Sequence, residues 1–238
     1  MPRESHVARA ERALQVLEAL AQAMPGAHIE LDYRTPFELL VAVILAAQCT
    51  DKRVNLVTPA LFKSFPDARA VAQAPLPALE KLVKSCGFFR AKSRALKAVS
   101  SALLQHHGGS VPKSRPALAA LPGVGNKTAG VVSIHIGGEP AFPVDTHVRR
   151  LSRRLGFTRR LDPDHIEADL QALVPKAWWA QGHQLLVWHG RRTCFARKPA
   201  CDRCVVAALC PKVGVPKAKP TRPRRPTAPG RAATGPRL

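Results

Sequence analysis

Four of the six cysteines lie close together near the C-terminal end of the chain, in a spacing that could hold a metal centre. Six, two and five residues separate Cys194, Cys201, Cys204 and Cys210 in turn. No secretory signal is visible in the N-terminal segment, so we expect these clustered thiols to bind metal rather than to form disulfides. Four thiolates suit zinc or an iron–sulfur cluster. Zinc ribbons usually use two Cys-x2-Cys pairs, and this array has only one. The spacing could instead wrap a cubane-type cluster. Such a cluster would either only stabilise the fold or also transfer electrons.

The segment 121–128, Leu-Pro-Gly-Val-Gly-Asn-Lys-Thr, combines a phosphate-binding turn with a lysine. Gly123 and Gly125 can adopt positive φ values or let a phosphate approach closely, and consecutive N–H groups at the start of a helix form an anion site. We predict Asn126 as the N-cap of that helix, which places Lys127 in its first turn. Lys127 is then either a phosphate contact or, when deprotonated, a nucleophilic amine.

Asp145 is a second candidate for chemistry, because it stands directly before an amphipathic helix in the string Pro-Val-Asp-Thr-His-Val at residues 143–148. We predict that Asp145 caps this helix, since Asp is a preferred N-cap residue whose carboxylate accepts from backbone N–H groups. A carboxylate that is fixed in this way could also stabilise a positively charged intermediate. His147 is either a packed histidine or a phosphate contact.

Helices must position these groups, because almost every segment before residue 211 has apolar residues at helical spacing. We predict helices over residues 4–23, 37–49, 54–61, 79–83, 91–107, 116–121, 126–136, 146–155, 165–174 and 181–189. No run of alternating polarity is long enough for a strand, which indicates an all-α protein. The segment 37–49 is apolar on nearly all sides and is predicted as a central helix, with Cys49 and Cys86 as small buried apolar side chains.

The charge of the chain indicates a polyanionic partner. The chain carries 37 Lys and Arg against 16 Asp and Glu, a formal net charge of +21. Residues 211–238 contain eight Lys and Arg, seven Pro and no acid, so we predict a disordered basic tail that either attracts phosphates or only aids solubility. Without this tail the chain still carries +13. The longest apolar run, residues 39–47, is far shorter than the about 20 residues of a membrane span, so we expect no membrane partner.

Three of these motifs together resemble the endonuclease III family, a group of DNA glycosylases and abasic-site lyases of base excision repair. Residues 189–199 with the cysteines that follow resemble the C-terminal cluster of the family. Residues 121–125 resemble its helix-hairpin-helix, and residues 144–147 resemble its second catalytic element. The resemblance covers about residues 10–211 and implies a [4Fe–4S] cluster as cofactor on the four cysteines.

The same resemblance implies the catalytic roles. Lys127 attacks the sugar carbon C1′ as the damaged base leaves, Asp145 stabilises the cationic sugar, and the resulting Schiff base permits β-elimination of the 3′ phosphate. Attack at C1′ requires a flipped nucleotide. Residues 44–51 and 86–92 resemble family segments that fill the vacated stack, which implies that Gln48 enters the stack and Phe88 wedges between bases. From residue type alone, Gln48 is a polar helix end and Phe88 a core aromatic.

The resemblance further implies two lobes and a set of DNA contacts. A helical barrel would occupy residues 29–139, with the helix-hairpin-helix at about 114–136, and an iron–sulfur lobe would combine residues 1–28 and 140–210. The two catalytic residues are expected to face each other across the cleft between the lobes. The implied DNA-binding residues, besides Gln48 and Phe88, are Gly123, Gly125, Thr128, His147, Arg197 and Lys198.

The expected partner is double-stranded DNA that contains damaged pyrimidines or abasic sites, and we expect a cytoplasmic, nucleoid-associated monomer. Ala46, Ala119 and Asn126 stand where the family often has Ser, an acid and Arg, which leaves the lesion preference open. One alternative is an adenine-glycosylase-like monofunctional enzyme, which typically lacks a lysine at the position of Lys127. Another is a non-catalytic or weakly active DNA-binding iron–sulfur paralogue.

Overall fold

The computed structural model describes residues 4–215, which form eleven α-helices, three short 3₁₀ helices and no β-strand. The prediction of an all-α fold is therefore confirmed. The elements are α1 (His6–Ala23), α2 (Pro36–Ala46), α3 (Asp51–Ser64), α4 (Ala68–Gln73), α5 (Leu76–Val83), η1 (Lys84–Cys86), α6 (Phe89–His107), α7 (Arg115–Ala119), α8 (Asn126–His135), α9 (Thr146–Arg154), α10 (Pro163–Leu173), η2 (Lys176–Trp178), α11 (Trp179–Arg192) and η3 (Cys201–Arg203).

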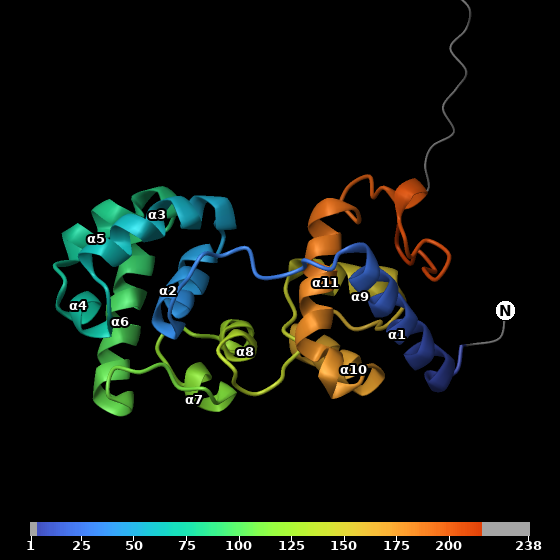
Figure 1. Ribbon diagram of the computed structural model, residues 1–238, viewed down its shortest axis with the longest axis horizontal. Helices are drawn as coiled ribbons and strands as arrows, with labels where there is room; N and C mark the ends of the chain where they lie inside the picture. Colours follow the sequence, from blue (N-terminus) through green and yellow to red (C-terminus); the bar gives the residue numbers. More distant parts are fainter. Residues whose placement is uncertain (1–3, 216–238) are drawn as a thin grey trace, which may run out of the picture.

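The helices pack around two separate apolar cores. Helices α2–α8 surround one core, and α1 packs with α9–α11 around the other. Figure 1 shows the two groups side by side, joined by the connection after α1 and the connection after α8. The chain therefore begins in the second lobe, passes through the whole of the first and returns, which leaves two connections between the lobes.

Helix α2 is the centre of the first lobe, and every residue from 37 to 45 is buried. Its start is fixed by the N-cap Thr35, whose Oγ1 accepts from the Glu38 N–H at 3.2 Å, and by the Glu38 carboxylate, which accepts from the Arg34 N–H at 2.7 Å. The helix ends at Ala46, three residues before the predicted end, because the chain turns sharply through Gln48, whose φ is 54°.

Side-chain contacts hold the two lobes together. The Arg115 guanidinium of α7 donates to both carboxylate oxygens of Glu167 of α10, at 2.6 and 2.7 Å. Glu167 also accepts from the Phe142 N–H at 3.2 Å. Near the other connection, Gln184 Nε2 of α11 lies 2.8 Å from His135 Nε2 of α8. These contacts fix the width of the space between the lobes.

The described structure continues for five residues past Cys210, the fourth cysteine of the array. The Val213 N–H donates to the Arg154 carbonyl at 3.0 Å, so residues 211–215, the start of the predicted tail, pack against α9 instead of being disordered. The rest of that tail, residues 216–238, lies outside the described residues. Within the part of the chain that the structure describes, no helix combines the length and the apolar character needed to cross a bilayer.

Candidate active site

Lys127 and Asp145 line one cleft between the two lobes. The first lobe supplies Lys127 and Thr128 from α8, and the second supplies Asp145, which precedes α9, together with His183 from α11. The structure therefore places the amine and the carboxylate on opposite walls of the same cleft.

Lys127 is the second residue of α8 and is exposed to solvent. The N-cap is Gly125, with φ −83° and ψ 171°, and not Asn126 as predicted. The Gly125 carbonyl accepts the first helical bond, from Ala129 N–H at 2.9 Å, so Asn126 already lies inside the helix. No side chain caps the first N–H groups of α8, which leaves them available to an anion. Gly123, with φ 77°, makes the turn that brings the chain to this helix.

Asp145 caps α9, as its sequence position predicts. Its Oδ1 accepts from the Val148 N–H at 2.7 Å, and the side chain is half-buried. The carboxylate is therefore held in one orientation at the cleft wall, with its second oxygen not used by this cap.

His183 also lines this cleft, although nothing in the sequence singled it out. The imidazole is buried, and its Nδ1 donates to the Pro143 carbonyl at 2.8 Å, two residues before Asp145. Burial lowers the pKa of His183 to about 4, and the nearby Lys127 contributes to this decrease while Asp145 opposes it. His183 is therefore neutral at physiological pH. A histidine in an apolar helical stretch carries no local signal for such a position.

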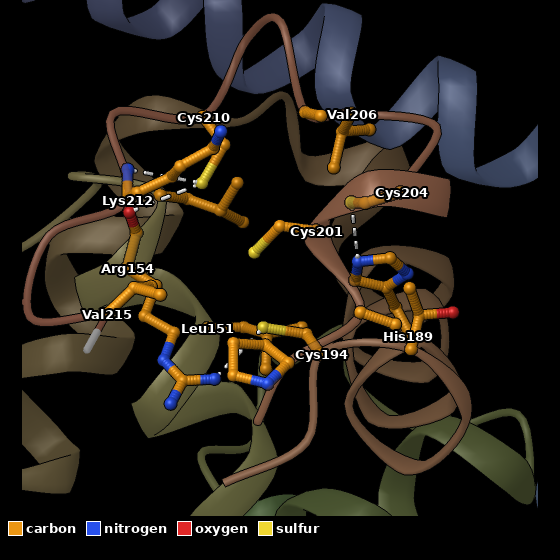
Figure 2. A pocket seen from close by; sticks show the side chains of 15 residues that line it. Leu151, Arg154, His189, Cys194, Cys201, Cys204, Val206, Cys210, Lys212 and Val215 are labelled. Atoms are coloured by element: carbon orange, nitrogen blue, oxygen red, sulfur yellow. Dashed lines mark hydrogen bonds between the residues drawn. The ribbon is translucent and has the colours of Figure 1, made fainter. Parts of the chain in front are cut away.

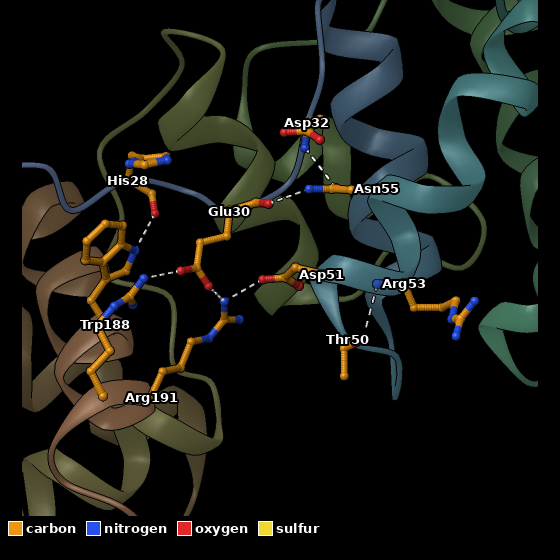
Figure 3. Close-up of polar contacts among 10 residues, drawn as sticks. His28, Glu30, Asp32, Thr50, Asp51, Arg53, Asn55, Trp188 and Arg191 are labelled. Atoms are coloured by element: carbon orange, nitrogen blue, oxygen red, sulfur yellow. Dashed lines mark hydrogen bonds and ion pairs between the residues drawn. The ribbon is translucent and has the colours of Figure 1, made fainter.

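A group of ion pairs closes one side of the cleft (Figure 3). Arg191 of α11 donates to Asp51 at the start of α3, at 2.5 Å, and also to Glu30 in the connection after α1. Arg192 pairs with Glu30 as well. Burial tends to raise the pKa of Glu30, but the hydrogen bonds from Arg192 and Arg191 outweigh it, so the pKa lies below its usual value. The pairs link the second lobe to the first beside the catalytic candidates.

Gln48 and Phe88 lie on two exposed turns of the first lobe. Both have left-handed backbone conformations, with φ values of 54° and 46°. Phe88 has 65% of its surface exposed, so it is not the core aromatic that its residue type allows; its neighbour Phe89 packs against the first core instead. Non-glycine residues adopt this conformation rarely, and such strain gathers at functional sites.

The other predicted DNA contacts occupy mixed positions. Thr128 is half-buried in the cleft wall. His147 is half-buried between α9 and α11, and its Nδ1 lies 3.1 Å from an Arg150 nitrogen. Of its two predicted roles, these surroundings are those of a packed histidine. Arg197 and Lys198 are exposed on the loop between the first two cysteines of the array, and Lys198 has a φ of 53°.

The four clustered cysteines line a single cavity in the second lobe (Figure 2). Leu151 and Val206 form part of its apolar wall. Within the described residues, three nitrogen atoms approach these sulfur atoms: Arg154 Nη1 lies 3.2 Å from Cys194 Sγ, the Lys212 nitrogen 3.4 Å from Cys210 Sγ, and His189 Nε2 3.4 Å from Cys204 Sγ. N–H donors of this kind favour thiolates, whereas burial by itself raises the pKa of Cys204 and Cys210.

The donor set of this cavity fits an iron–sulfur cluster. A cubane cluster takes one thiolate at each of its four irons, so its ligands surround a larger body than a single metal ion. The four thiols around a shared apolar cavity match that requirement.

Comparisons with known proteins agree with this geometry. Residues 41–176 match the model of the HhH-GPD superfamily of base excision DNA repair proteins, and residues 194–210 match the iron–sulfur binding domain of endonuclease III. Endonuclease III of Synechocystis sp. is 48% identical over 202 residues, which cover 84% of this chain and 92% of that protein. Endonuclease III of Bacillus subtilis is 42% identical over 82% of this chain and 89% of its own length. A solved trapped endonuclease III–DNA covalent intermediate superposes with a TM-score of 0.82 at 41% identity, over 85% of this chain and 96% of that one.

Proposed function

Because the chain belongs to the endonuclease III family of the HhH-GPD superfamily, we propose that Lys127 and Asp145 are its catalytic pair. The protein is a bifunctional DNA glycosylase and abasic-site lyase of base excision repair. The observation that carries the residue assignment is that the amine and the fixed carboxylate line one cleft from opposite lobes.

The reaction follows from these two groups. Neutral Lys127 Nζ donates its electron pair to C1′ while the C1′–N bond to the base breaks, and the base leaves with the electrons of that bond and gains a proton. Asp145 stabilises the positive charge that develops on the sugar. Nζ gives one proton to the departing base; the C1′–O4′ bond then breaks, O4′ takes up the second proton of Nζ, and an imine forms between Nζ and C1′. Loss of a C2′ proton then expels the 3′ phosphate, and water hydrolyses the imine to free the lysine.

The substrate is DNA, and we infer the finer handling of it from the exposed groups around the cleft. The uncapped N–H groups of α8, with Gly123, Gly125 and Thr128, suit a backbone phosphate. Gln48 and Phe88 suit the space left by the flipped nucleotide. His147, Arg197 and Lys198 are further phosphate contacts in this proposal. The substrate class is double-stranded DNA with damaged pyrimidines or abasic sites.

The cofactor of the chain is a [4Fe–4S] cluster. Its ligands in this proposal are Cys194, Cys201, Cys204 and Cys210, whose thiols share the cavity of Figure 2. When bound, the cluster would supply four iron–thiolate bonds that cross-link the C-terminal loops and could also carry an electron. The chain itself places the exposed Arg197 and Lys198 on one of those loops, outside the cavity.

We extend the proposal to the organisation of the molecule. Its units are the barrel at residues 29–139 and the iron–sulfur lobe at residues 1–28 and 140–210, and the enzyme works as a monomer at the nucleoid. An adenine-glycosylase-like or non-catalytic role is not favoured, since Lys127 stands in the cleft opposite Asp145.

Strand cleavage tests the catalytic assignment. The wild-type chain should nick a duplex that contains one abasic site, and Lys127→Gln should lose this nicking while it retains affinity for the duplex. Lys81→Gln changes an exposed lysine on α5 and serves as the matched control, with unchanged nicking expected. Nicking by Lys127→Gln at the wild-type rate would refute the role of Lys127.

A further inference from the structure

Lys92 is a buried lysine that joins two turns of the first lobe. Its side chain lies on α6 and only 6% of the residue surface is exposed. The Nζ donates to the Leu45 carbonyl at 2.9 Å and to the Cys86 carbonyl at 2.7 Å. Among the described residues, Lys92 has no carboxylate partner. One ammonium group thus binds the last turn of α2 and the end of η1 at the same time.

These two carbonyls lie within three residues of the exposed Gln48 and Phe88. Leu45 precedes Gln48 by three residues, and Cys86 precedes Phe88 by two. Both exposed residues have left-handed backbone conformations, which persist only where the surrounding structure imposes them. The charge-assisted bonds from Lys92 are a buried constraint on both turns.

The side chains of Cys49 and Cys86, next to the two turns, also connect these turns. Cys49 and Cys86 both pack in the first apolar core. Burial raises the pKa of the Cys86 thiol to about 11, and Cys49 adds to this rise. Cys49 follows Gln48 directly in the chain. The positive charge of Lys92 is also well placed at the carbonyl end of α2, where a helix dipole favours a cation. The two turns therefore share one support, centred on Lys92.

We propose that Lys92 is a positioning residue that couples the two turns, so that Gln48 and Phe88 enter the DNA stack as one unit. The inference rests on the proposed function, in which these two side chains fill the space of the flipped nucleotide. Lys92 touches neither DNA nor the reacting atoms and acts only through the backbone carbonyls that it holds. Its loss should impair extraction of a nucleotide from a duplex more than the chemistry at C1′.

Two substrates separate extraction from chemistry. An abasic site within a duplex requires the stack to be opened, whereas the same site in a single strand does not. We measure single-turnover nicking of both by the cluster-loaded protein, and compare the ratio of duplex to single-strand rates. Lys92→Met gives a side chain of similar length that has no hydrogen-bond donor, and it should lower this ratio at least tenfold. Phe88→Ala should lower it similarly, and adding Lys92→Met to Phe88→Ala should lower it little further.

Lys97 supplies the matched control, because it lies on the same helix and its Nζ donates to a different carbonyl, that of Ala74, at 2.5 Å. Lys97→Met should leave the ratio unchanged. If Lys92→Met does not fold, Lys92→Gln, whose amide can reach one carbonyl, should give an intermediate ratio. An unchanged ratio in folded Lys92→Met or Lys92→Gln would overturn the inference. A wild-type chain that nicks neither substrate would instead overturn the proposed function, and this inference with it.

Discussion

Asp145 caps α9, and the catalytic role that we propose for it depends on this cap. The carboxylate caps α9 through the Val148 N–H, and the same contact fixes its direction at the cleft wall. A group with two tasks can be tested only by variants that separate them. Asn caps a helix about as well as Asp does but carries no charge. Ala provides neither the cap nor the charge.

Asp145→Asn should therefore nearly preserve the free energy of unfolding and lower the rate of nicking on the order of a hundredfold, by comparison with the loss of one electrostatic group in other active sites. Asp145→Ala should lose similar activity and also about 1 kcal/mol of stability. Thermal unfolding and single-turnover nicking measure the two effects. Full activity in Asp145→Asn would show that Asp145 is only a cap.

His183 predicts a dependence of stability on pH. Its pKa is about 4 in the folded protein and 6.5 as an ordinary histidine, because burial disfavours the charged ring. Below about pH 6.5 the unfolded chain therefore binds a proton on this histidine, whereas the folded chain binds it only below about pH 4. The contribution of His183 to stability is complete above pH 6.5 and is lost as the pH falls toward 4.

His183→Asn removes the titrating ring, and its amide can still donate to the Pro143 carbonyl. Between pH 6.5 and 4, the free energy of unfolding of the wild type should fall more steeply than that of the variant, by up to about 1.4 kcal/mol per pH unit. Denaturant unfolding at several pH values measures both slopes. Parallel slopes would mean that His183 titrates normally.

At the scale of elements, periodicity was sufficient to predict most of the helices. The apolar run from 37 onwards does form the buried central helix α2. Helix α4 was missed, because six residues are too few to display a helical period. The capping of α8 was predicted wrongly, since Asn is a common N-cap, yet the backbone of Gly125 reaches the extended conformation there without any side-chain bond.

Contacts between distant elements could not be predicted in this way. The bond from Lys92 to the Leu45 carbonyl and the ion pairs of Arg191 each join segments that are far apart in the chain. Lys and Arg are ordinary residues at exposed helix positions, so the sequence does not reveal that Lys92 and Arg191 make these contacts. Only the packed structure does. Lys127, Asp145 and the cysteines were accessible because their signals, a turn, a cap and a spacing, are local.

The contact of α7 with α10 is expected to matter for the relative position of the lobes. Glu167 is buried, so Arg115→Ala would leave its carboxylate without a cationic partner, at a cost of about 3 kcal/mol. The exposed pair of Arg9 with Glu4 is the control, and Arg9→Ala should cost less than about 1 kcal/mol. Chemical denaturation measures both. Equal costs would show that Arg115 does not hold the lobes together.

At the scale of the whole molecule, we expect the positive charge to attract DNA. The basic residues beyond position 215 add seven Lys and Arg to a chain that is already positive without them. Each phosphate that a Lys or Arg neutralises releases counterions, so affinity falls as salt rises.

Deletion of residues 216–238 should therefore flatten the dependence of duplex affinity on salt, by up to about 0.9 in the logarithmic slope for each phosphate that is no longer neutralised. Binding of Lys127→Gln to an abasic duplex, with and without residues 216–238, measures this without turnover. An unchanged slope would leave solubility as the role of this segment.

The proposed mechanism depends on a bond between the amine of Lys127 and the sugar, in the cleft that Lys127 and Asp145 line from different lobes. Reduction with borohydride during the reaction on an abasic duplex converts the imine to a stable bond, and mass spectrometry of the digested adduct locates the modified lysine. We expect the adduct on Lys127 and none in Lys127→Gln. An adduct on another lysine, or undiminished trapping in Lys127→Gln, would contradict the assignment.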